Sequence, residues 1–363
     1  MYSLHDLGWN EAWESTFQLY KDKGYIPARI SKEMKNSYSV IMESGEANAR
    51  LSDLLWKAAK NRSMLPAIGD WVALQQKHIG DPYQIMEVLP RKSCFSRKAK
   101  NTFGRNFTKP GSSDEQVLSA NVDIVFLVIA LDADYKLGKI ERYLSLINES
   151  GAKTVLILNK ADICGDYEDK VEEAKAHYPQ VPVHAISAID EWGIAAILSY
   201  LKTGITISLI GSSGVGKSTL INAIVGAELL AVGEIRRADS RGRHTTAVRE
   251  MVILSQGGVL IDNPGLRDIK IFGSEENLED IFRDIVNLEK QCRFSDCHHD
   301  TEPGCAVKAA IQKGEIDAER LESYQTLKKE LAQVNKRREQ RKKHEDILIY
   351  KEKRRGYNIP QPY

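Results

Sequence analysis

Residues 205–218 have the sequence ITISLIGSSGVGKS, an apolar run followed by a glycine-rich loop that ends in Lys217 and Ser218. The loop fits the pattern G-x-x-x-x-G-K-[ST], in which glycines let backbone N–H groups turn toward a phosphate. Ile205–Ile210 predicts a buried strand and Thr219–Val225 a helix, so the loop would precede a helix N-terminus, where anions bind. We predict a phosphate-binding loop made of Gly211, Ser212, Ser213, Gly214, Val215, Gly216, Lys217, Ser218 and Thr219.

Two side chains of this loop have specific predicted roles. Lys217 would reach the β- and γ-phosphates of a nucleotide, and the Ser218 hydroxyl would coordinate Mg²⁺. The alternative is a glycine-rich turn without a ligand.

The sequence around the loop predicts a doubly wound α/β domain over residues 112–272. Continuous apolar runs are typical of strands buried on both faces of a parallel sheet. Helical patterns at Ile140–Ser150 and Tyr167–His177 supply crossover connections. The runs are VDIVFLVIAL from 122, TVLILNK from 154, VHAIS from 183, REMVIL from 249 and GVLIDNPG from 258.

The tetrapeptide Asn159-Lys160-Ala161-Asp162 follows the run TVLIL and indicates which base is bound. An Asn159 amide can pair with guanine at O6 and N7. An Asp162 carboxylate accepts from guanine N1–H and the exocyclic amine, which adenine does not offer. The Lys160 stem can lie against the ring. The end of the next run suits a backbone N–H to guanine O6, at Ser187 and Ala188.

Residues that would contact Mg²⁺ and the γ-phosphate lie on either side of the run REMVIL. Asp262 ends the run GVLI and would act on Mg²⁺ indirectly, while Gly265 would offer an N–H to the γ-phosphate. In the segment RGRHTT at 241–246, a threonine hydroxyl would complete the Mg²⁺ shell. The spacing does not separate Thr245 from Thr246, and Thr246 is the one that we assign to Mg²⁺.

The residue that orients the attacking water is less clearly marked. Ras-like proteins have a catalytic Gln directly after the glycine of D-x-x-G, and this chain has Leu266 there. Slow intrinsic hydrolysis is therefore expected. His244 is the nearest polar candidate to position water, and a surface histidine or an RNA contact is an equal alternative. The predicted catalytic set is His244, Lys217, Thr245, Thr246 and Gly265.

The order of these motifs is unusual, because N-K-x-D at 159 and S-A at 187 precede the phosphate loop at 211. Ordinary GTPases run from the phosphate loop through D-x-x-G to N-K-x-D. The same sheet results if the chain is circularly permuted. We therefore expect a permuted GTPase domain whose D-x-x-G segment leads into the C-terminal unit.

Three of the five cysteines lie within fourteen residues near the C-terminus, beside two histidines. Cys292, Cys297 and Cys305 with His298 or His299 would give three thiolates and one imidazole, the donor set of a closed, structural Zn²⁺ site. The alternative is three unrelated thiols. The helical pattern Leu321, Tyr324, Leu327, Leu331 and Val334 predicts one apolar face in the same unit, over residues 273–363.

The N-terminal third has a different texture. Trp9, Trp13 and Phe17 at helical spacing predict a short helical extension over residues 1–24 that packs on the body. Residues 25–111 then carry short β-rich runs separated by turn residues, which predicts an OB-type barrel. The runs are IPARIS, SYSVIME, ANARLS, GDWVALQQ and YQIMEVL.

Composition restricts the class of protein. The 363 residues have 42% hydrophobic and 28% charged residues, which is ordinary globular usage. The longest apolar run, Ile124–Leu131, is far below the ~18 residues that span a bilayer, and no basic and apolar leader begins the chain. We therefore expect a cytoplasmic protein that does not contact a membrane. The formal net charge is only +1, but the tail from Leu327 to Arg355 is rich in Lys and Arg, a candidate nucleic-acid contact.

Taken together, these motifs resemble the ribosome small-subunit-dependent GTPase A family, bacterial circularly permuted GTPases of ribosome assembly. The resemblance covers nearly the whole chain. Besides the nucleotide motifs it includes GDWV at 69–72, VLPRKSCFSRK at 88–98 and CRFSDCHHDTEPGCAV at 292–307. The family spacing favours His299 over His298 as the fourth metal ligand. The family histidine that matches His244 acts in hydrolysis, so the resemblance also implies that role for His244.

The resemblance implies an OB domain, a permuted GTPase domain and a C-terminal zinc domain with one Zn²⁺. It implies GTP hydrolysis with Mg²⁺, stimulated by the small (30S) ribosomal subunit during its late maturation, and contacts with rRNA. A monomer is expected. The chain departs from the family at Asn263, where Thr is usual, a position without an expected Mg²⁺ or phosphate role.

Three other functions compete with this one. The chain could be a guanine-nucleotide-switched RNA-binding protein, or a diverged paralogue with little ribosome-stimulated hydrolysis, and Leu266 favours such a reading. A P-loop ATPase is the third alternative, against which Asp162 argues.

Overall fold

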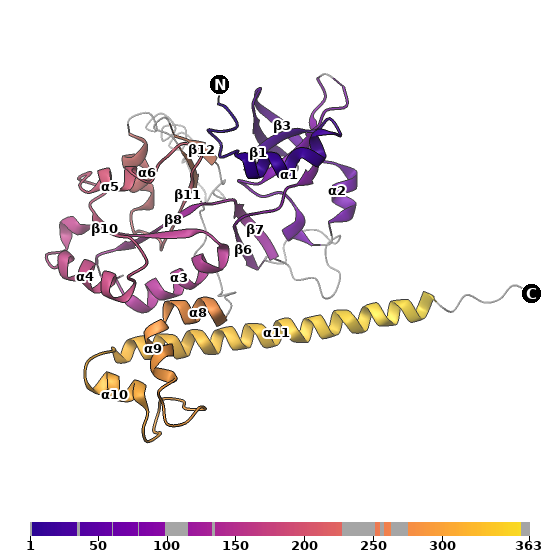
Figure 1. Ribbon diagram of the computed structural model, residues 1–363. Coiled ribbons are helices and arrows are strands. Elements are labelled where there is room, and N and C mark those ends of the chain that lie inside the picture. Colours follow the sequence, from indigo (N-terminus) through magenta and orange to yellow (C-terminus); the bar gives the residue numbers. More distant parts are fainter. Residues whose placement is uncertain are drawn as a thin grey trace, which may run out of the picture. The chain divides into compact units, whose positions relative to one another are not determined.

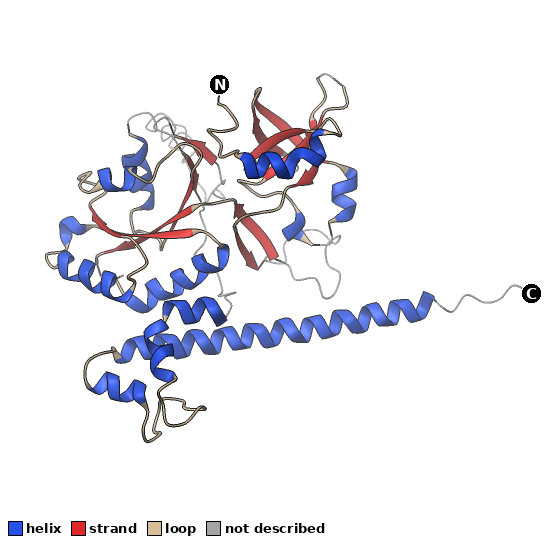
Figure 2. Cartoon of the chain, in the orientation of Figure 1, coloured by secondary structure: helices blue, strands red, loops and turns tan. Residues whose placement is uncertain are grey.

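The computed structural model describes residues 2–34, 37–59, 61–78, 80–98, 115–132, 135–226, 251–254, 258–262 and 275–356 (Figures 1 and 2). It divides into two compact units. The described residues of the first unit lie within Met1–Lys100 and Asp114–Lys270, and those of the second lie within Ile271–Tyr363. Within the described ranges, no helix is both long and apolar enough to cross a bilayer. The predicted boundaries at 111/112 and 272/273 fall between described ranges and stay predictions.

The first unit begins with a closed five-stranded barrel, as predicted. Its strands pair in the order β1-β2-β3-β5-β4, and β1 closes the ring on β4. All pairs are antiparallel except β3 with β5. This is the arrangement of an OB barrel. The strands are β1 (Ile26–Glu33), β2 (Tyr38–Met42), β3 (Gly45–Leu51), β4 (Trp71–Gln75) and β5 (Tyr83–Val88), with α2 (Asp53–Ala58) and η1 (Arg62–Met64) between β3 and β4.

The predicted N-terminal helix is α1 (Glu11–Lys21), which packs its aromatic face on the barrel. The Asn10 side chain caps it by accepting from the N–H groups of Ala12 and Trp13. The Trp9 ring meets the Trp71 ring edge-on, with 4.7 Å between centroids. The apolar spacing read from the sequence therefore marks an interior face.

A buried arginine joins the N-terminal segment, the barrel and the start of the α/β domain. Arg29 on β1 donates to the carbonyl oxygens of Leu7, Gly69 (3.1 Å) and Asn121 (3.2 Å). Burial lowers the pKa of Arg29 to about 10, so the guanidinium stays charged at neutral pH. Because its donors bond to three separate segments, it fixes how they meet. β6 (Cys94–Lys98) and β7 (Glu115–Ala120) pair in a two-stranded sheet and precede the central sheet.

The central sheet has the order β10-β9-β8-β11-β13-β12. Strands β8 to β11 and β13 are parallel, and their side chains are almost entirely buried, as the continuous apolar runs predict. The strands are β8 (Ile124–Ala130), β9 (Lys153–Asn159), β10 (Val183–Ile186), β11 (Thr206–Ile210), β12 (Met251–Ile253) and β13 (Val259–Asp262). The helices are α3 (Leu137–Ser150), α4 (Tyr167–His177), α5 (Ile194–Leu198) and α6 (Lys217–Val225).

One strand differs from the parallel arrangement that its apolar run suggested. β12 pairs antiparallel with β13 at the sheet edge. Only residues 254–258 join the two strands, and so short a connection permits a hairpin but no crossover.

The topology brings the ends of four strands to one edge of the sheet. β9 ends at Asn159, β10 at Ile186, β11 at Ile210 and β13 at Asp262. In parallel strands the carboxyl ends share an edge, and ligands of doubly wound sheets bind there. The permuted motif order therefore leaves the motifs at one site.

The second unit is helical, with α8 (Glu275–Ile281), α9 (Arg283–Glu289), α10 (Ala306–Gln312) and α11 (Ala318–Gly356). Leu321, Tyr324, Leu327 and Leu331 are buried, which confirms the predicted apolar face, and the side chain of Val334 lies outside the description. Arg320 on α11 donates twice to the Asp284 carboxylate on α9, at 2.7 and 2.9 Å. Burial would raise the pKa of Asp284, but the bonds from Arg320 outweigh it and hold that pKa below its usual value.

Replacing Arg29 with Leu should lower the free energy of unfolding by about 3 kcal/mol, because it leaves buried carbonyl groups without donors. Denaturant unfolding of the chain measures this. Arg50→Leu is the control, since Arg50 is exposed on β3. Equal unfolding free energies for the two variants would contradict the role given to Arg29.

Candidate functional site

The phosphate loop occupies the turn between β11 and α6. Gly211, Gly214 and Gly216 have φ angles of +156°, +82° and +93°. A Cβ on Gly211 would lie 2.2 Å from the Val128 carbonyl oxygen, and one on Gly216 would lie 2.3 Å from Asn159 Nδ2. Glycine is therefore required at both positions, and the loop ends at the N-terminus of α6, where backbone N–H groups favour an anion.

The Lys217 side chain lies across its own loop. Its Nζ donates to the carbonyl oxygens of Gly211 (2.8 Å) and Ser212 (2.5 Å). Ser218 and Thr219 are exposed at the start of α6. The Ser212 Oγ is buried without a hydrogen-bond partner among the described residues. The ammonium group is thus held beside the concavity where phosphates would bind.

Asn159 connects three of the predicted motifs. Its side chain is buried, its Nδ2 donates to the Val215 carbonyl oxygen at 2.8 Å, and its Oδ1 accepts from the Ala188 N–H at 3.0 Å. One amide therefore ties the N-K-A-D segment to the phosphate loop and to the S-A segment. A primary amide has two N–H bonds, so Asn159 keeps a second donor beyond the bond to Val215.

The other base-side residues lie on the loops that follow β9 and β10. Ala161 is buried and Asp162 is exposed, both in the short η2 helix (Ala161–Ile163). Lys160 has a left-handed φ of +69°, and its Nζ lies 2.9 Å from Asp132 Oδ2. The Ser187 Oγ donates to Asp190 at 3.0 Å. The Ala188 N–H, predicted to bind guanine O6, is the donor that Asn159 already uses.

The remaining nucleotide residues are only partly described. The backbone of Asp262 ends β13 and pairs with Leu209, while its side chain lies outside the description. His244, Thr245, Thr246, Asn263, Gly265 and Leu266 lie outside the described residues. Their predicted roles therefore stay predictions.

The four predicted metal ligands come together in the second unit. The ligand atoms of Cys292, Cys297, His299 and Cys305 all lie within 4.8 Å of one another, whereas the His298 side chain is exposed. Cys292 Sγ is 3.9 Å from Cys305 Sγ and 3.7 Å from His299 Nδ1. Tetrahedral bonds of about 2.3 Å to Zn²⁺ separate neighbouring donors by roughly 3.7 Å. The donor set and its spacing fit a structural metal site.

The surroundings of Cys297 favour its protonated thiol. Desolvation, and then the neighbouring Cys305 and Cys292, raise the pKa of Cys297 to about 11. Metal ligation requires the thiolate, so binding would release protons.

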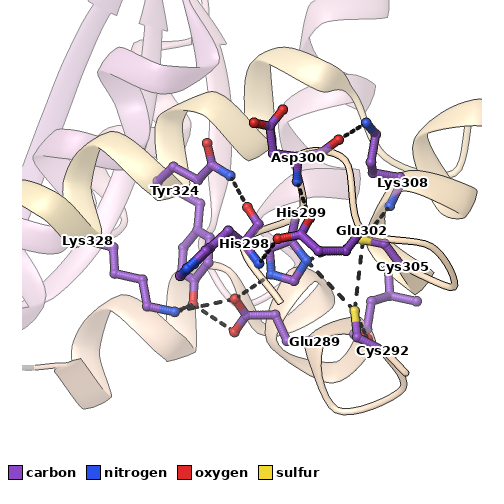
Figure 3. A network of polar contacts seen from close by, with 12 residues as sticks. Glu289, Cys292, His298, His299, Asp300, Glu302, Cys305, Lys308, Tyr324 and Lys328 are labelled. Atoms are coloured by element: carbon purple, nitrogen blue, oxygen red, sulfur yellow. Dashed lines mark hydrogen bonds and ion pairs between the residues drawn. The ribbon is translucent and has the colours of Figure 1, made fainter. Parts of the chain in front are cut away.

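A carboxylate holds the ligand histidine in place (Figure 3). His299 Nε2 lies 2.9 Å from Glu289 Oε1 on α9, which leaves Nδ1 facing the sulfurs. Tyr324 and Lys328 on α11 donate to the same carboxylate, at 3.0 and 3.3 Å. Burial would raise the pKa of Glu289, but these bonds outweigh it and keep that pKa below its usual value. A carboxylate on the outer nitrogen is the usual partner of a metal-binding histidine.

The loop between Cys297 and Cys305 is organised by Glu302. Its carboxylate accepts from the N–H groups of His298, Asp300 and Thr301, at 2.9, 2.9 and 3.1 Å. These backbone bonds lower the pKa of Glu302 to about 2. The charged carboxylate therefore stabilises the turn that presents His299, whose φ is +60°.

Sequence reasoning gave no role to Glu289, Glu302, Asp132 or Asp190. Asp132 directly follows an apolar strand, and a polar residue at the carboxyl end of a parallel strand was a usable signal. Asp190 lies three residues after Ser187, within reach of a local side-chain bond. Glu289 gives no such signal, since acidic residues are common on helix surfaces.

A phosphate loop and an N-K-x-D segment on neighbouring loops at one edge of a parallel sheet define a P-loop GTPase. The sequence matches the family described as RsgA GTPase over residues 88–272. The chain belongs to the RsgA GTPase family, whose members are GTP hydrolases that use Mg²⁺ with GTP. A second family description, 50S ribosome-binding GTPase, matches residues 206–351.

Curated relatives are similar over most of their length. The small ribosomal subunit biogenesis GTPase RsgA of Methanosarcina acetivorans is 41% identical over 92% of this chain and 86% of its own. The protein of the same name from Opitutus terrae is 38% identical over 92% of this chain and 91% of its own.

Solved structures share the architecture. The crystal structure of YjeQ from Thermotoga maritima, 27% identical, matches 85% of this chain and 99% of its own, with a TM-score of 0.60. YloQ, described as a circularly permuted GTPase, has a TM-score of 0.58 over 86% of this chain and 96% of its own. At 23% identity it supports the fold alone.

Glu289→Gln should weaken Zn²⁺ binding by roughly 10- to 100-fold, because a neutral amide orients His299 less firmly and adds no charge. Competition with a chromophoric chelator measures the affinity. The control is Glu322→Gln, at an exposed position of α11. Equal zinc retention by the two variants would show that Glu289 does not support the site.

Proposed function

We propose that this chain hydrolyses GTP to GDP and phosphate under stimulation by the small ribosomal subunit, as a factor in late maturation of that subunit. The observation that carries the proposal is the Asn159 amide, which ties the base-side loops to the phosphate loop. The names of the curated relatives support the ribosomal part.

The phosphate loop would bind GTP through backbone N–H groups of Gly211–Thr219, with Lys217 leaving its loop carbonyls for the β- and γ-phosphates. When a nucleotide binds, the Lys217 ammonium group would replace its two carbonyl acceptors, Gly211 and Ser212, with phosphate oxygens. Ser218 and Thr246 would hold Mg²⁺, with Asp262 acting on it indirectly, and the ion would neutralise charge on the phosphates when bound.

Guanine would be read by the loops after β9 and β10. The free N–H of Asn159 would donate to N7, and Asp162 would accept from N1–H and the exocyclic amine. The Ala188 N–H would donate to O6 while still close to Asn159 Oδ1. Ala161 and Ser187 would support these contacts through the backbone and through the bond from Ser187 to Asp190. Adenine presents the opposite pattern at its edge, so ATP would be rejected.

In the hydrolysis step, water would attack the γ-phosphorus while the bond to the β–γ bridging oxygen breaks, leaving GDP and phosphate. Gly265 would donate its N–H to the γ-phosphate and His244 would orient the water. Leu266 offers no polar group for that task, so the unstimulated rate should be low. A ribosome-dependent increase would then reflect contacts with the subunit that place His244, Thr245 and Thr246 for the reaction.

The metal of the second unit would be a single structural Zn²⁺. Its ligands would be Cys292, Cys297, His299 and Cys305, with no position left open for substrate. The metal would pin a segment of about fourteen residues that is too small for a core of its own.

The chain would act as a monomer in the cytoplasm, where ribosomal subunits mature. The barrel at 25–111 and the zinc unit at 273–363 would contact rRNA, and the GTPase domain at 112–272 would report nucleotide state. OB barrels bind nucleic acid, and the basic stretch Leu327–Arg355 would add salt-sensitive contacts.

Steady-state GTP hydrolysis with and without purified small subunits tests the proposal, with Lys217→Ala as the blank. We expect a rise of at least about tenfold with small subunits and none in the blank, since Lys217 stabilises charge on the transferred phosphate.

Large subunits are the control, because one matching family description names the 50S particle. Stimulation by large subunits and not by small ones would identify the large subunit as the partner and contradict the proposal. Guanine-nucleotide binding without turnover, even with saturating small subunits, would favour the nucleotide-switched RNA-binding protein.

A further inference from the structure

An ion pair connects the loop after β8 to the lysine of the N-K-A-D segment. Lys160 Nζ lies 2.9 Å from Asp132 Oδ2. The side chains are 29% and 34% exposed, so neither is fully solvated. β8 and β9 are adjacent parallel strands, and the Leu131 N–H donates to the Asn159 carbonyl oxygen at 2.8 Å. Asp132 directly follows Leu131 and Lys160 directly follows Asn159, so this backbone hydrogen bond places the two side chains next to each other.

The conformation of Lys160 depends on the contacts around it. Its backbone φ of +69° lies in the left-handed region, which a non-glycine residue occupies only when its surroundings hold it there. A lysine side chain also has four flexible methylene groups. Without a partner for the ammonium group, the stem would sample many positions.

Lys160 lies between residues that are proposed to bind guanine, so the position of its side chain affects the base. It lies between Asn159, which bonds to the phosphate loop and the S-A segment, and the η2 helix that carries Asp162. These are the residues through which guanine is read in the proposed function, on which this inference rests. A fixed stem there can cover one face of the base with apolar surface, whereas a mobile stem would lose entropy on binding.

We propose that Asp132 is a positioning residue for guanine: its carboxylate holds the Lys160 ammonium group and so keeps the lysine stem in place against the base. Asp132 itself touches neither base nor phosphate. Asp132 would raise the affinity for the guanine base equally in GDP and in GTP. It would have no role in the phosphoryl-transfer step.

The test is a double-mutant cycle on nucleotide affinity, measured by calorimetry with GDP and with a non-hydrolysable GTP analogue. Asp132→Asn should weaken the binding of both ligands by roughly two- to fivefold, the effect of one partly exposed ion pair. Lys160→Met removes the ammonium group and keeps an apolar stem. In that background, Asp132→Asn should cause no further loss, because the pair is already absent.

Two further measurements separate positioning from a general structural effect. In steady-state hydrolysis, Asp132→Asn should raise KM with kcat unchanged. Asp132→Glu, which keeps the charge, should recover part of the affinity. Glu172→Gln is the matched control, since Glu172 pairs with Lys175 at 2.8 Å on exposed α4 and should leave affinity and turnover unaltered.

The outcomes are distinct. Equal losses from Asp132→Asn in the wild-type and Lys160→Met backgrounds would overturn the inference, as would a fall in kcat alone or a loss confined to GTP. If the wild-type chain bound no guanine nucleotide at all, the proposed function itself would fail.

Discussion

One buried amide gives the nucleotide site its shape. The Asn159 side chain bonds to Val215 of the phosphate loop and to the Ala188 N–H, so loops that follow three different strands are held at fixed separations. The approach is so close that a Cβ on Gly216 would lie 2.3 Å from the amide nitrogen. In the proposed function, base recognition and phosphate binding would therefore depend on the same side chain, because its two hydrogen bonds couple the loops.

This constraint explains why the permuted chain order does not disturb the site. A parallel sheet gathers the carboxyl ends of its strands at one edge, whatever their order along the chain. The consequence of permutation lies in the connections instead. Among the described strands of the sheet, β13, which carries Asp262, comes last along the chain, and the chain then continues into the second unit. That unit has its own polar network, in which Glu289 links His299, a candidate metal ligand, to α11 through Tyr324 and Lys328.

The fold and the cluster of four candidate metal ligands could be predicted from the sequence because their signals are local. The phosphate loop, N-K-A-D and the cysteine spacing are short motifs, and the buried strands and the face from Leu321 to Leu331 follow from apolar periodicity. The bond from Asn159 to Val215, the pair of Asp132 with Lys160 and the contact of Glu289 with His299 could not, since each joins residues that only the tertiary arrangement brings together. The antiparallel pairing of β12 was missed for a different reason: an apolar run does not show strand direction, although the short connection to β13 was a local signal for a hairpin. His244, Thr245, Thr246 and Gly265 lie outside the described residues, and their roles rest on the sequence.

Competition binding with GDP, ADP and xanthosine diphosphate, on the wild-type chain and on Asp162→Asn, tests the guanine site most directly. An Asn at 162 can accept from xanthine N1–H and donate to its O2, but it no longer accepts from both guanine donors. The wild-type chain should prefer GDP over both competitors, and Asp162→Asn should reverse the preference between GDP and xanthosine diphosphate by at least about tenfold. Equal competition by ADP, or a preference that Asp162→Asn leaves unmoved, would contradict the assignment of these loops to guanine.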